Sequence, residues 1–252
     1  MKILLSTLLF FSLLFSIHSQ TRDNADRIAT DQGDLIIQPI THGTVALEWN
    51  SQTIYVDPYG GAEKFEGLND PDIILITDIH GDHLNMKTLE AINTSKAQFF
   101  VPQAVMDKLP ESMQAKAIVI NNGSATDFNG INIAAIPMYN LPDDESSRHK
   151  KGRGNGYVLT MGGKKVYLSG DTEDIPEMRA LKNIDVAFIC MNLPYTMDIN
   201  QAASAVSEFK PGIVYPYHYR GSGGLSDVEG FKLLVNETSA GVEVRLKNWY
   251  MN

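Results

Sequence analysis

Short apolar runs alternate with turn residues along most of the chain from Asp34 onwards. Runs rich in β-branched and aromatic residues, bounded by glycine, proline or asparagine, are typical of β-strands. They predict strands over residues 34–40, 43–49, 53–57, 72–77, 98–102, 116–120, 131–137, 156–161, 164–169, 185–190, 212–217 and 242–246. The run "DIILIT" (72–77) is nearly all apolar, so we expect that strand to be buried on both faces.

Segments with apolar residues at helical spacing lie between these strands. They predict helices over residues 85–93, 103–109, 175–183, 199–209 and 226–238. Two β-rich halves with covering helices predict an α/β fold, a four-layer αββα sandwich of two packed mixed sheets with helices on the outer faces. Residues 141–156 are the only long stretch without periodicity, and such loops tend to be functional or mobile.

The first twenty residues, "MKILLSTLLFFSLLFSIHSQ", differ from the rest of the chain. A lysine at position 2, an apolar run and a small residue at position 19 predict a secretory signal over residues 1–19. The run is short for a membrane span, which needs about 20 apolar residues. An uncleaved anchor is the alternative. We therefore expect export to the periplasm or the extracellular space, and a single domain over residues 20–252.

The net charge limits the classes of molecule that the chain could bind, and the cysteine content limits its cross-links. Without residues 1–19 the chain carries 20 basic and 30 acidic residues, a formal net charge of −10. This balance argues against binding to nucleic acid or to an anionic membrane. Cys190 is the only cysteine, so no intramolecular disulfide can form. It ends a predicted strand, and we interpret it as a buried packing residue.

The stretch "ITDIHGDHL" (76–84) follows the predicted buried strand. It holds four candidate metal ligands, Asp78, His80, Asp82 and His83. Imidazole suits zinc and iron, and carboxylates favour harder metals. Gly81 would let this loop turn tightly. The alternative is a helix N-terminus capped by Asp82 or Asn85, with the histidines on the surface.

Two later residues favour the metal-binding interpretation. Asp171 follows a predicted strand in "SGDT", and His218 follows another in "PYHYR". Each has an ordinary alternative: a turn or helix-capping residue for Asp171, a loop histidine for His218. Their joint occurrence after strands, where loops gather at one edge of a layered α/β structure, predicts one shared site with the 76–84 stretch.

In order and approximate spacing, "DIHGDH", "SGDT" and "PYHYR" resemble the motifs of the metallo-β-lactamase fold superfamily. The resemblance covers most of the chain beyond residue 19. The opening "ITHGTVALEW", followed by "IYVDPYG", resembles the branch that contains the ascorbate-6-phosphate lactonases and the N-acyl-phosphatidylethanolamine phospholipase D enzymes. That branch implies that His42 lies beside the metals, that Asp57 braces the metal loop and that Asp171 bridges two ions.

The sequence departs from the family pattern at two positions. Asp78 stands where the family has its first histidine. The third histidine of the first metal site is absent from its expected place, where "MYN" ends in Asn140. His149, in the long loop, could reach the metals or could be a solvated loop residue. Asn140 is a further candidate for contact with a metal or the substrate.

The resemblance therefore implies one site of Asp82, His83, Asp171 and His218, and a first site of His80, Asp78, the shared Asp171 and an unidentified group. Three aspartates among the ligands would make manganese or iron competitors of zinc.

We expect an exported hydrolase that uses a metal-activated water on a small ester, lactone, amide or phosphodiester, with Asp82 orienting the water and accepting its proton. Arg220 and the basic run 148–153 could hold an anionic group of the substrate, although charge runs are usually solvated. The alternative function is a degenerate homologue that binds metal and a small ligand without turnover.

Overall fold

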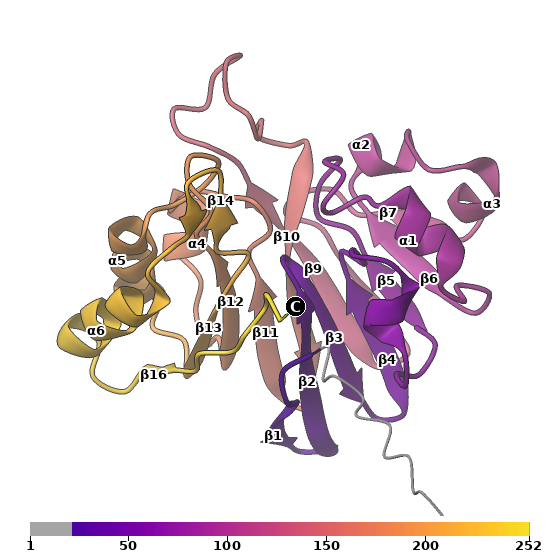
Figure 1. Ribbon diagram of the computed structural model, residues 1–252. Coiled ribbons are helices and arrows are strands. Elements are labelled where there is room, and N and C mark those ends of the chain that lie inside the picture. The colour runs from indigo at the N-terminus through magenta and orange to yellow at the C-terminus, as the bar shows by residue number, and fades with distance from the viewer. Residues whose placement is uncertain (1–21, 252) are drawn as a thin grey trace, which may run out of the picture.

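The computed structural model describes residues 22–251, so the predicted signal segment (1–19) lies outside the described residues. Its framework consists of two seven-stranded sheets (Figure 1). In the order of pairing, the first sheet contains β1 (Asp26–Thr30), β2 (Gly33–Thr41), β3 (Thr44–Trp49), β4 (Gln52–Val56), β5 (Ile73–Leu75), β6 (Gln98–Val101) and β7 (Ala117–Val119). Strands β1 to β4 pair antiparallel, and β4 to β7 pair parallel.

The second sheet repeats this plan. In the order of pairing, it contains β8 (Ala125–Phe128), β9 (Ile131–Met138), β10 (Gly154–Met161), β11 (Lys164–Leu168), β12 (Val186–Cys190), β13 (Ile213–Tyr217) and β16 (Glu243–Val244). Strands β8 to β11 pair antiparallel, and β11, β12, β13 and β16 pair parallel. A small hairpin of β14 (Arg220–Gly221) and β15 (Gly224–Leu225) follows β13.

Helices cover the outer faces of both sheets (Figure 1). The first sheet carries the short helices η1 (Ala62–Phe65), α1 (Met86–Ala91), α2 (Gln103–Met106) and α3 (Glu111–Gln114). The second carries α4 (Pro176–Arg179), α5 (Ile199–Phe209) and α6 (Val228–Thr238). The predicted αββα arrangement is confirmed. No helix within residues 22–251 is long and apolar enough to cross a membrane.

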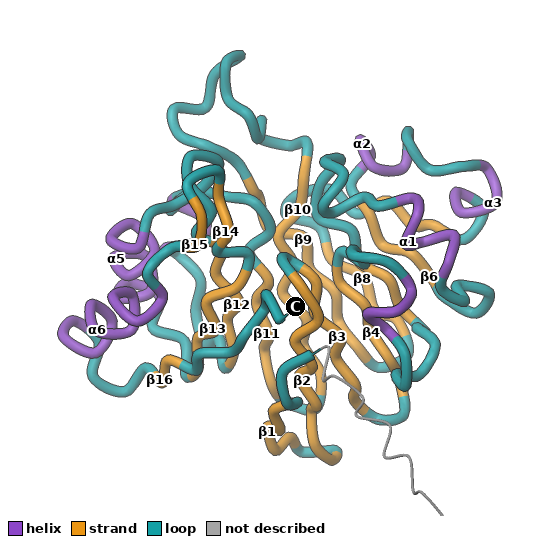
Figure 2. The backbone as a smooth tube through the Cα atoms, viewed as in Figure 1, coloured by secondary structure: helices purple, strands orange, loops and turns teal. Residues whose placement is uncertain are grey.

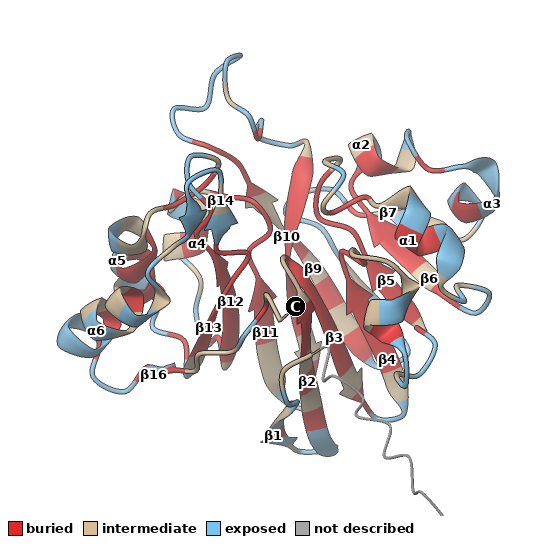
Figure 3. Cartoon of the chain, in the orientation of Figure 1, coloured by how far each residue is buried: buried red, intermediate tan, exposed pale blue. Residues whose placement is uncertain are grey.

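The core explains why these segments fold as strands. Along β5, Ile73 and Leu75 face the cluster between the two sheets, whereas Ile74 faces the cluster beneath the helices of the first sheet. All three are fully buried, which confirms that this strand is covered on both faces. Cys190 is also fully buried, and burial raises the pKa of its thiol to about 11. Figure 3 shows this burial along the strands, with exposure on the outer sides of the helices.

Element boundaries differ from the predictions where local sequence signals are weak. The expected helix over 175–183 ends at Arg179, and the strand expected over 242–246 is only two residues long. Strands β1 and β8 and helix α3 were not predicted. Strand β1 is an edge strand with only one buried residue, so its hydrophobic pattern is faint.

Hydrogen bonds from the start of β10 join the two sheets. The hydroxyl of Tyr157 donates to the carbonyls of Ile76 (2.9 Å) and Phe100 (3.1 Å), which belong to the first sheet's side of the molecule. The Asn155 N–H donates to the carbonyl of Thr77 at 2.9 Å. These bonds fix the residues just after β5 against the second sheet. The loop between β9 and β10 projects beyond the ends of the sheets from this region (Figure 2).

We predict that Gly156→Ala destabilises the protein. A Cβ at position 156 would lie 2.9 Å from the carbonyl oxygen of Ser169 and 3.0 Å from that of Leu168, and backbone atoms cannot move aside easily. Overpacking of this kind typically costs about 1–3 kcal/mol of unfolding free energy. Urea denaturation measures the loss. Gly223→Ala is the matched control, because a Cβ there meets nothing within 4 Å. Equal stability of the two variants would contradict the prediction.

Candidate metal centre

Asp171 lies at the centre of a cluster of imidazoles. Its carboxylate oxygens are 3.4 Å from Nε2 of His83, 3.3 Å from Nε2 of His149 and 3.3 Å from Nε2 of His218. The three histidines come from three separate loops, and all of them are buried. Asp171 itself follows the end of β11. The structure therefore brings together residues that the sequence places far apart.

The other members of the cluster also follow strand ends. Asp57 follows β4, the 76–84 stretch follows β5, and His218 follows β13. Strands β4, β5 and β13 each pair parallel with at least one neighbour, and the carboxyl ends of parallel strands are where α/β proteins form their sites. The site is thus a consequence of strand direction in both sheets.

Asp57 braces His83, as the family resemblance implied. Its Oδ2 lies 2.7 Å from Nδ1 of His83, and the Thr77 hydroxyl donates to the same oxygen at 2.5 Å. The Thr77 N–H donates to Oδ1 at 2.7 Å. A carboxylate only accepts, so Nδ1 of His83 carries the hydrogen and Nε2 is left free to bind a metal.

Asn140 plays the corresponding part for His149. Its Oδ1 accepts from the N–H of His149 (2.8 Å) and lies 2.9 Å from Nδ1 of the same residue. The amide nitrogen of Asn140 donates to Glu173 and to the carbonyl of Tyr195. His149 is fully buried, and its Nε2 has no hydrogen-bond partner. The solvated alternative for His149 is wrong, and Asn140 contacts it directly.

His80 is held by Asp78. The Nδ1 of His80 lies 2.6 Å from Oδ2 of Asp78, which is fully buried. Arg153 also binds Asp78, through Nε to Oδ1 at 3.1 Å and Nη2 to Oδ2 at 3.0 Å. Asp78, His80 and His149 offer ligand atoms that all lie within 4.8 Å of one another. This is the first of the two ligand groups that the motif predicts.

Asp82 belongs to the second group. Its Oδ2 lies 3.4 Å from Nε2 of His218 and 3.1 Å from Nε2 of His42. His42, Asp82 and His218 offer ligand atoms within 4.8 Å of one another, and so do His83, Asp171 and His218; these two sets share His218 and together are called the second group. The Asp82 side chain is 34% exposed, whereas those of His83 and His218 are 1% exposed. Asp82 is therefore the member of this group that solvent and substrate can reach.

The C-terminal segment completes the site through His42. The hydroxyl of Tyr250 lies 2.9 Å from Nδ1 of His42 and accepts the N–H of Arg220 at 2.9 Å. The tyrosine hydrogen is then available to Nδ1, so His42 carries its own hydrogen on Nε2 and donates it to Asp82. No local pattern in the sequence marks Tyr250 for this role.

Three residues of the site have left-handed backbone conformations. The φ angles of His42, Asp57 and His218 are 54°, 45° and 47°. Non-glycine residues adopt this region rarely and at a cost, and such residues cluster at functional sites. The backbone of His218 donates its N–H to the carbonyl of His42 at 3.1 Å, which fixes two of the three in place together.

Burial and the neighbouring histidines shift the pKa values of Asp171 and Asp82 in opposite directions. Burial would raise the pKa of Asp171, but the neighbouring imidazoles of His218 and His83 hold that pKa well below its usual value. Burial would also raise the pKa of Asp82, but hydrogen bonds with His218 and His42 outweigh it, and its pKa is lowered. Both groups are therefore ionised at neutral pH.

The pKa values of His83 and His42 shift in opposite directions. Burial would lower the pKa of His83, but Asp171 and Asp57 raise it well above its usual value. A proton and a metal ion therefore compete for His83. Burial lowers the pKa of His42 below its usual value and outweighs the hydrogen bond and charge of Asp82, which raise it, so the ring is neutral at neutral pH. This agrees with the hydrogen-bond pattern around its ring.

The donor set fits divalent transition metals. Nε2 of His83 and Nε2 of His218 are only 3.2 Å apart, although each ring is buried. Two nitrogen lone pairs facing each other would repel, so either a hydrogen on one of these nitrogens or a shared cation must lie between them. Nε2 of His149 and Oδ1 of Asp171 are buried without hydrogen-bond partners. All five histidines of residues 22–251 belong to this arrangement, together with three aspartates.

The basic residues near the site have partners of different kinds. The guanidinium of Arg220 lies 4.2 Å from the ring centre of Tyr250, and that of Arg148 lies 4.4 Å from the ring centre of Tyr195. Both arginines are exposed. The sequence identified Arg220 as a candidate but did not reveal that Arg153 would pair with Asp78.

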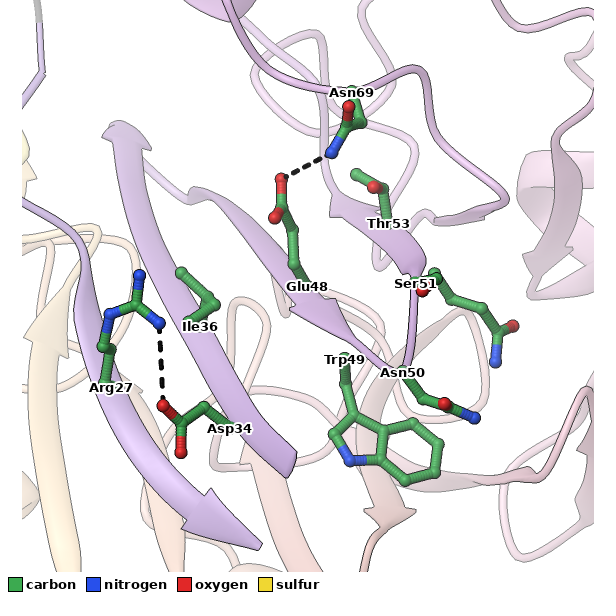
Figure 4. Close-up of a pocket in the computed structure, with 10 residues that line it drawn as sticks. Arg27, Asp34, Ile36, Glu48, Trp49, Asn50, Ser51, Thr53 and Asn69 are labelled. Atoms are coloured by element: carbon green, nitrogen blue, oxygen red, sulfur yellow. Dashed lines mark hydrogen bonds and ion pairs between the residues drawn. The ribbon is translucent and has the colours of Figure 1, made fainter. Parts of the chain in front are cut away.

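A cavity at the opposite end of the first sheet lacks the histidines of the candidate metal centre. It encloses about 360 Å³ and surrounds the turn between β3 and β4, with Trp49, Glu48 and Asn69 among its lining residues (Figure 4). Its polar contacts are an ion pair between Arg27 and Asp34 at 3.6 Å and a hydrogen bond from Asn69 to Glu48. No histidine lines it, so the histidine cluster is the candidate functional site.

Comparisons with known proteins agree with this geometry. The profile of the Beta-lactamase superfamily domain matches residues 37–218. A metal-dependent hydrolase of Pyrococcus abyssi is 29% identical over 206 residues, covering 78% of this chain and 90% of that protein. Another, of Thermococcus onnurineus, is 30% identical over 197 residues, covering 74% and 86%.

Solved structures show the same similarity. The crystal structure of a metal-dependent hydrolase from Parabacteroides distasonis superimposes with a TM-score of 0.79 at 37% identity, covering 89% of this chain and 98% of that chain. Igni18, a metallo hydrolase of Ignicoccus hospitalis, gives a TM-score of 0.71 at 25% identity, covering 84% and 94%.

We predict that Asp57→Asn lowers metal occupancy without unfolding the protein. Asparagine tolerates the left-handed backbone at this position. Its NH₂ group replaces one of the two acceptor oxygens and can only donate. Either the Thr77 N–H, or the Thr77 hydroxyl together with His83, therefore loses its acceptor, and the support of His83 is weakened. Removing such an outer partner typically costs roughly 10–100-fold in metal affinity. Titration with zinc against a competing chelator measures the change.

The control for this variant is Asp72→Asn. Asp72 also accepts a backbone N–H, from Thr53 at 2.9 Å, but it pairs with Lys96 away from the histidines. Its replacement should leave metal affinity unchanged. If Asp57→Asn binds zinc with wild-type affinity, Asp57 does not support the metal centre.

Proposed function

The chain belongs to the beta-lactamase superfamily, and from this premise we propose that its histidine–aspartate cluster holds two divalent metal ions for hydrolysis of a small substrate. Membership and the similarity to its relatives make the protein a metal-dependent hydrolase. The number of ions, the ligands and the substrate are our proposal. The observation that carries it is the Asp171 carboxylate, which lies within 3.4 Å of imidazoles from both ligand groups.

We assign the ligands by the two groups. His80 and His149 would hold the first ion, and Asp82, His83 and His218 the second. Asp171 would be shared, because one of its oxygens is 3.3 Å from His149 of the first group and 3.4 Å from His83 of the second. His149 would supply the ligand that the sequence pattern lacks, which supports an enzyme over the alternative of a non-catalytic binding protein.

Two such ions, when bound, lower the pKa of a shared water and stabilise negative charge that develops on the substrate. The chain's own residues do the rest. Asp82 is the exposed member of the second group, and His42 donates to its Oδ2 at 3.1 Å. Asp82 is thereby oriented to accept a proton, as expected from the motif.

His42 and Tyr250 form the next two members of this hydrogen-bonded chain. Tyr250 holds the ring of His42 through Nδ1, so the ring cannot turn its other nitrogen away from Asp82. Burial keeps the pKa of Tyr250 above its usual value, so the hydroxyl remains a donor at neutral pH. A substrate bound by Arg220 would lie beside this series of hydrogen bonds, because the backbone N–H of Arg220 donates to the Tyr250 hydroxyl.

The substrate we propose is small and anionic, with an ester, lactone, amide or phosphodiester bond. Arg148 and Arg220 are exposed, and each stacks on a tyrosine ring, which leaves guanidinium N–H groups free to bind a carboxylate or phosphate. Arg148 immediately precedes His149, and Arg220 follows His218 by two residues. The two arginines therefore flank the two ligand groups.

We also propose that the protein is exported. The basis is the apolar run behind Lys2, which precedes the described residues and has the length of a secretory signal. Separation of host cells into cytoplasm, periplasm and medium, followed by N-terminal sequencing of the recovered chain, tests this. A cytoplasmic protein that still begins at Met1 would contradict it.

The test of the catalytic proposal begins with metal-free protein. We expect the chelated protein to be inactive on a panel of anionic esters, lactones, amides and phosphodiesters. Reconstitution with zinc, manganese or iron(II) should restore hydrolysis of at least one class, with two ions per chain by elemental analysis. His149→Ala and His218→Ala should each abolish the restored activity, since each removes a ligand.

Controls separate loss of metal from loss of fold. Lys108→Ala changes an exposed residue of the loop after α2 and should retain activity and both ions. Thermal unfolding shows whether the histidine variants remain folded. One ion in the fully reconstituted wild type would overturn the two-ion assignment, and full activity of the metal-free protein would overturn the mechanism.

A further inference from the structure

Asp78, the departure from the family's first histidine, has no free carboxylate edge. Arg153 binds it in a two-pronged arrangement, Nε to Oδ1 at 3.1 Å and Nη2 to Oδ2 at 3.0 Å. Nδ1 of His80 lies 2.6 Å from the same Oδ2. Asp78 is fully buried, and the Arg153 side chain is 19% exposed. Three nitrogens thus contact the two oxygens of Asp78, and a fourth, Nε2 of His149, lies 4.0 Å from Oδ2.

The remaining arm of Arg153 closes the turn that carries His149. Its Nη1 donates to the carbonyl of Arg148 at 2.7 Å, and its backbone N–H donates to the carbonyl of Lys150 at 3.1 Å. Arg153 therefore contacts the metal loop on one side and residues 148–150 on the other. The pair of Asp78 and Arg153 joins two segments that are 75 positions apart in the sequence.

The chain shows elsewhere how a carboxylate supports a histidine. Oδ2 of Asp57 lies 2.7 Å from Nδ1 of His83, and this contact leaves Nε2 of His83 directed at Asp171. Asp78 meets Nδ1 of His80 with the same pair of atoms. Two carboxylates thus make the same contact to two successive histidines of the 76–84 stretch. Asp57 is in none of the ligand groups, whereas Asp78 lies close enough to His80 and His149 to be grouped with them, so the variants below must separate the two roles.

We propose that Asp78 and Arg153 are a positioning pair: Asp78 does not bind the first ion but orients His80 and, through Arg153, docks the turn that carries His149. This inference rests on the proposed two-ion centre. His149, in the loop between β9 and β10, then takes the place of the family's missing third histidine, and Asp78 anchors that loop.

The pair also alters the charge expected at the first ion. Asp78 as a ligand would add a negative charge and favour a harder metal. Paired with Arg153, its charge is compensated, and the first ion is left with the neutral His80 and His149 and the shared Asp171. Imidazole-rich sites of this kind suit zinc.

A double-mutant cycle on metal binding tests the pair without reference to activity. Asp78→Asn, Arg153→Met and the double variant are titrated with zinc against a competing chelator. Each single variant should lower affinity for the first ion by roughly 10–100-fold and leave the second ion unaffected. The double variant should be no weaker than either single one, because both substitutions break the same contact. His149→Ala, which removes the ligand itself, gives the reference for a vacant first position.

Matched variants isolate the geometry from the charge. Lys150→Met removes a positive charge from the same turn, where the ammonium pairs only with the exposed Glu145, and should bind both ions normally. Arg153→Lys keeps the charge but loses the two-pronged contact, so it should bind the first ion more weakly than wild type. Retention of the second ion shows that each variant is folded. Wild-type affinity in Arg153→Lys would refute the geometric role.

Direct ligation by Asp78 gives a different pattern. Asp78→Asn would then lose the first ion, whereas Arg153→Met would keep it or bind it more tightly, because the carboxylate would have lost its competitor. That result would overturn the positioning pair while leaving the two-ion centre intact. Fewer than two ions in the wild type would instead overturn the proposed centre before the variants are compared.

Discussion

A single buried carboxylate, that of Asp171, constrains the whole site. It is 3% exposed and has three imidazoles within 3.4 Å, each from a different loop. An ionised carboxylate in such surroundings is unfavourable unless positive charge compensates it. Protonated histidines can supply that charge in the metal-free chain, and metal ions would supply it in the loaded protein. The fold must therefore hold the three histidines against Asp171 whichever cation is present.

The support for these histidines is the recurring feature of the site. Asp57 fixes His83, Asn140 fixes His149, Asp78 fixes His80, and Tyr250 fixes His42. Each partner contacts Nδ1 of its histidine and so fixes the orientation of the ring, which determines where Nε2 points. The partners differ in chemical type, and they come from strand ends, from a loop and from the C-terminal segment. Ligand orientation is thus distributed over most of the chain's length.

The two sheets contribute unequally to this arrangement. The first sheet supplies the 76–84 stretch and Asp57, whereas the second supplies Asp171, His149 and His218. Contacts such as that of Tyr157 with the carbonyls of Ile76 and Phe100 hold the two contributions in register. A shift of one sheet against the other would separate the ligand groups, so inter-sheet packing and metal binding depend on the same contacts.

The sequence by itself determined the strands that place the site and most of its residues. Buried strands have strong apolar patterns, and the ligands after β5, β11 and β13 stand directly behind those patterns. Their order also identified the superfamily, which in turn located Asp57 and His42. The boundaries of short elements, such as β16 and α4, were less certain because few residues contribute to each.

Only the tertiary structure decided the positions and contacts of His149, Arg153 and Tyr250. His149 and Arg153 lie in a loop without periodicity, where no local pattern distinguishes a buried side chain from a solvated one. The contact of Arg153 with Asp78 spans 75 positions, and that of Tyr250 with His42 spans 208. Such contacts form only when the sheets have packed, because their energies depend on burial and on distance in space rather than on neighbouring residues in the sequence.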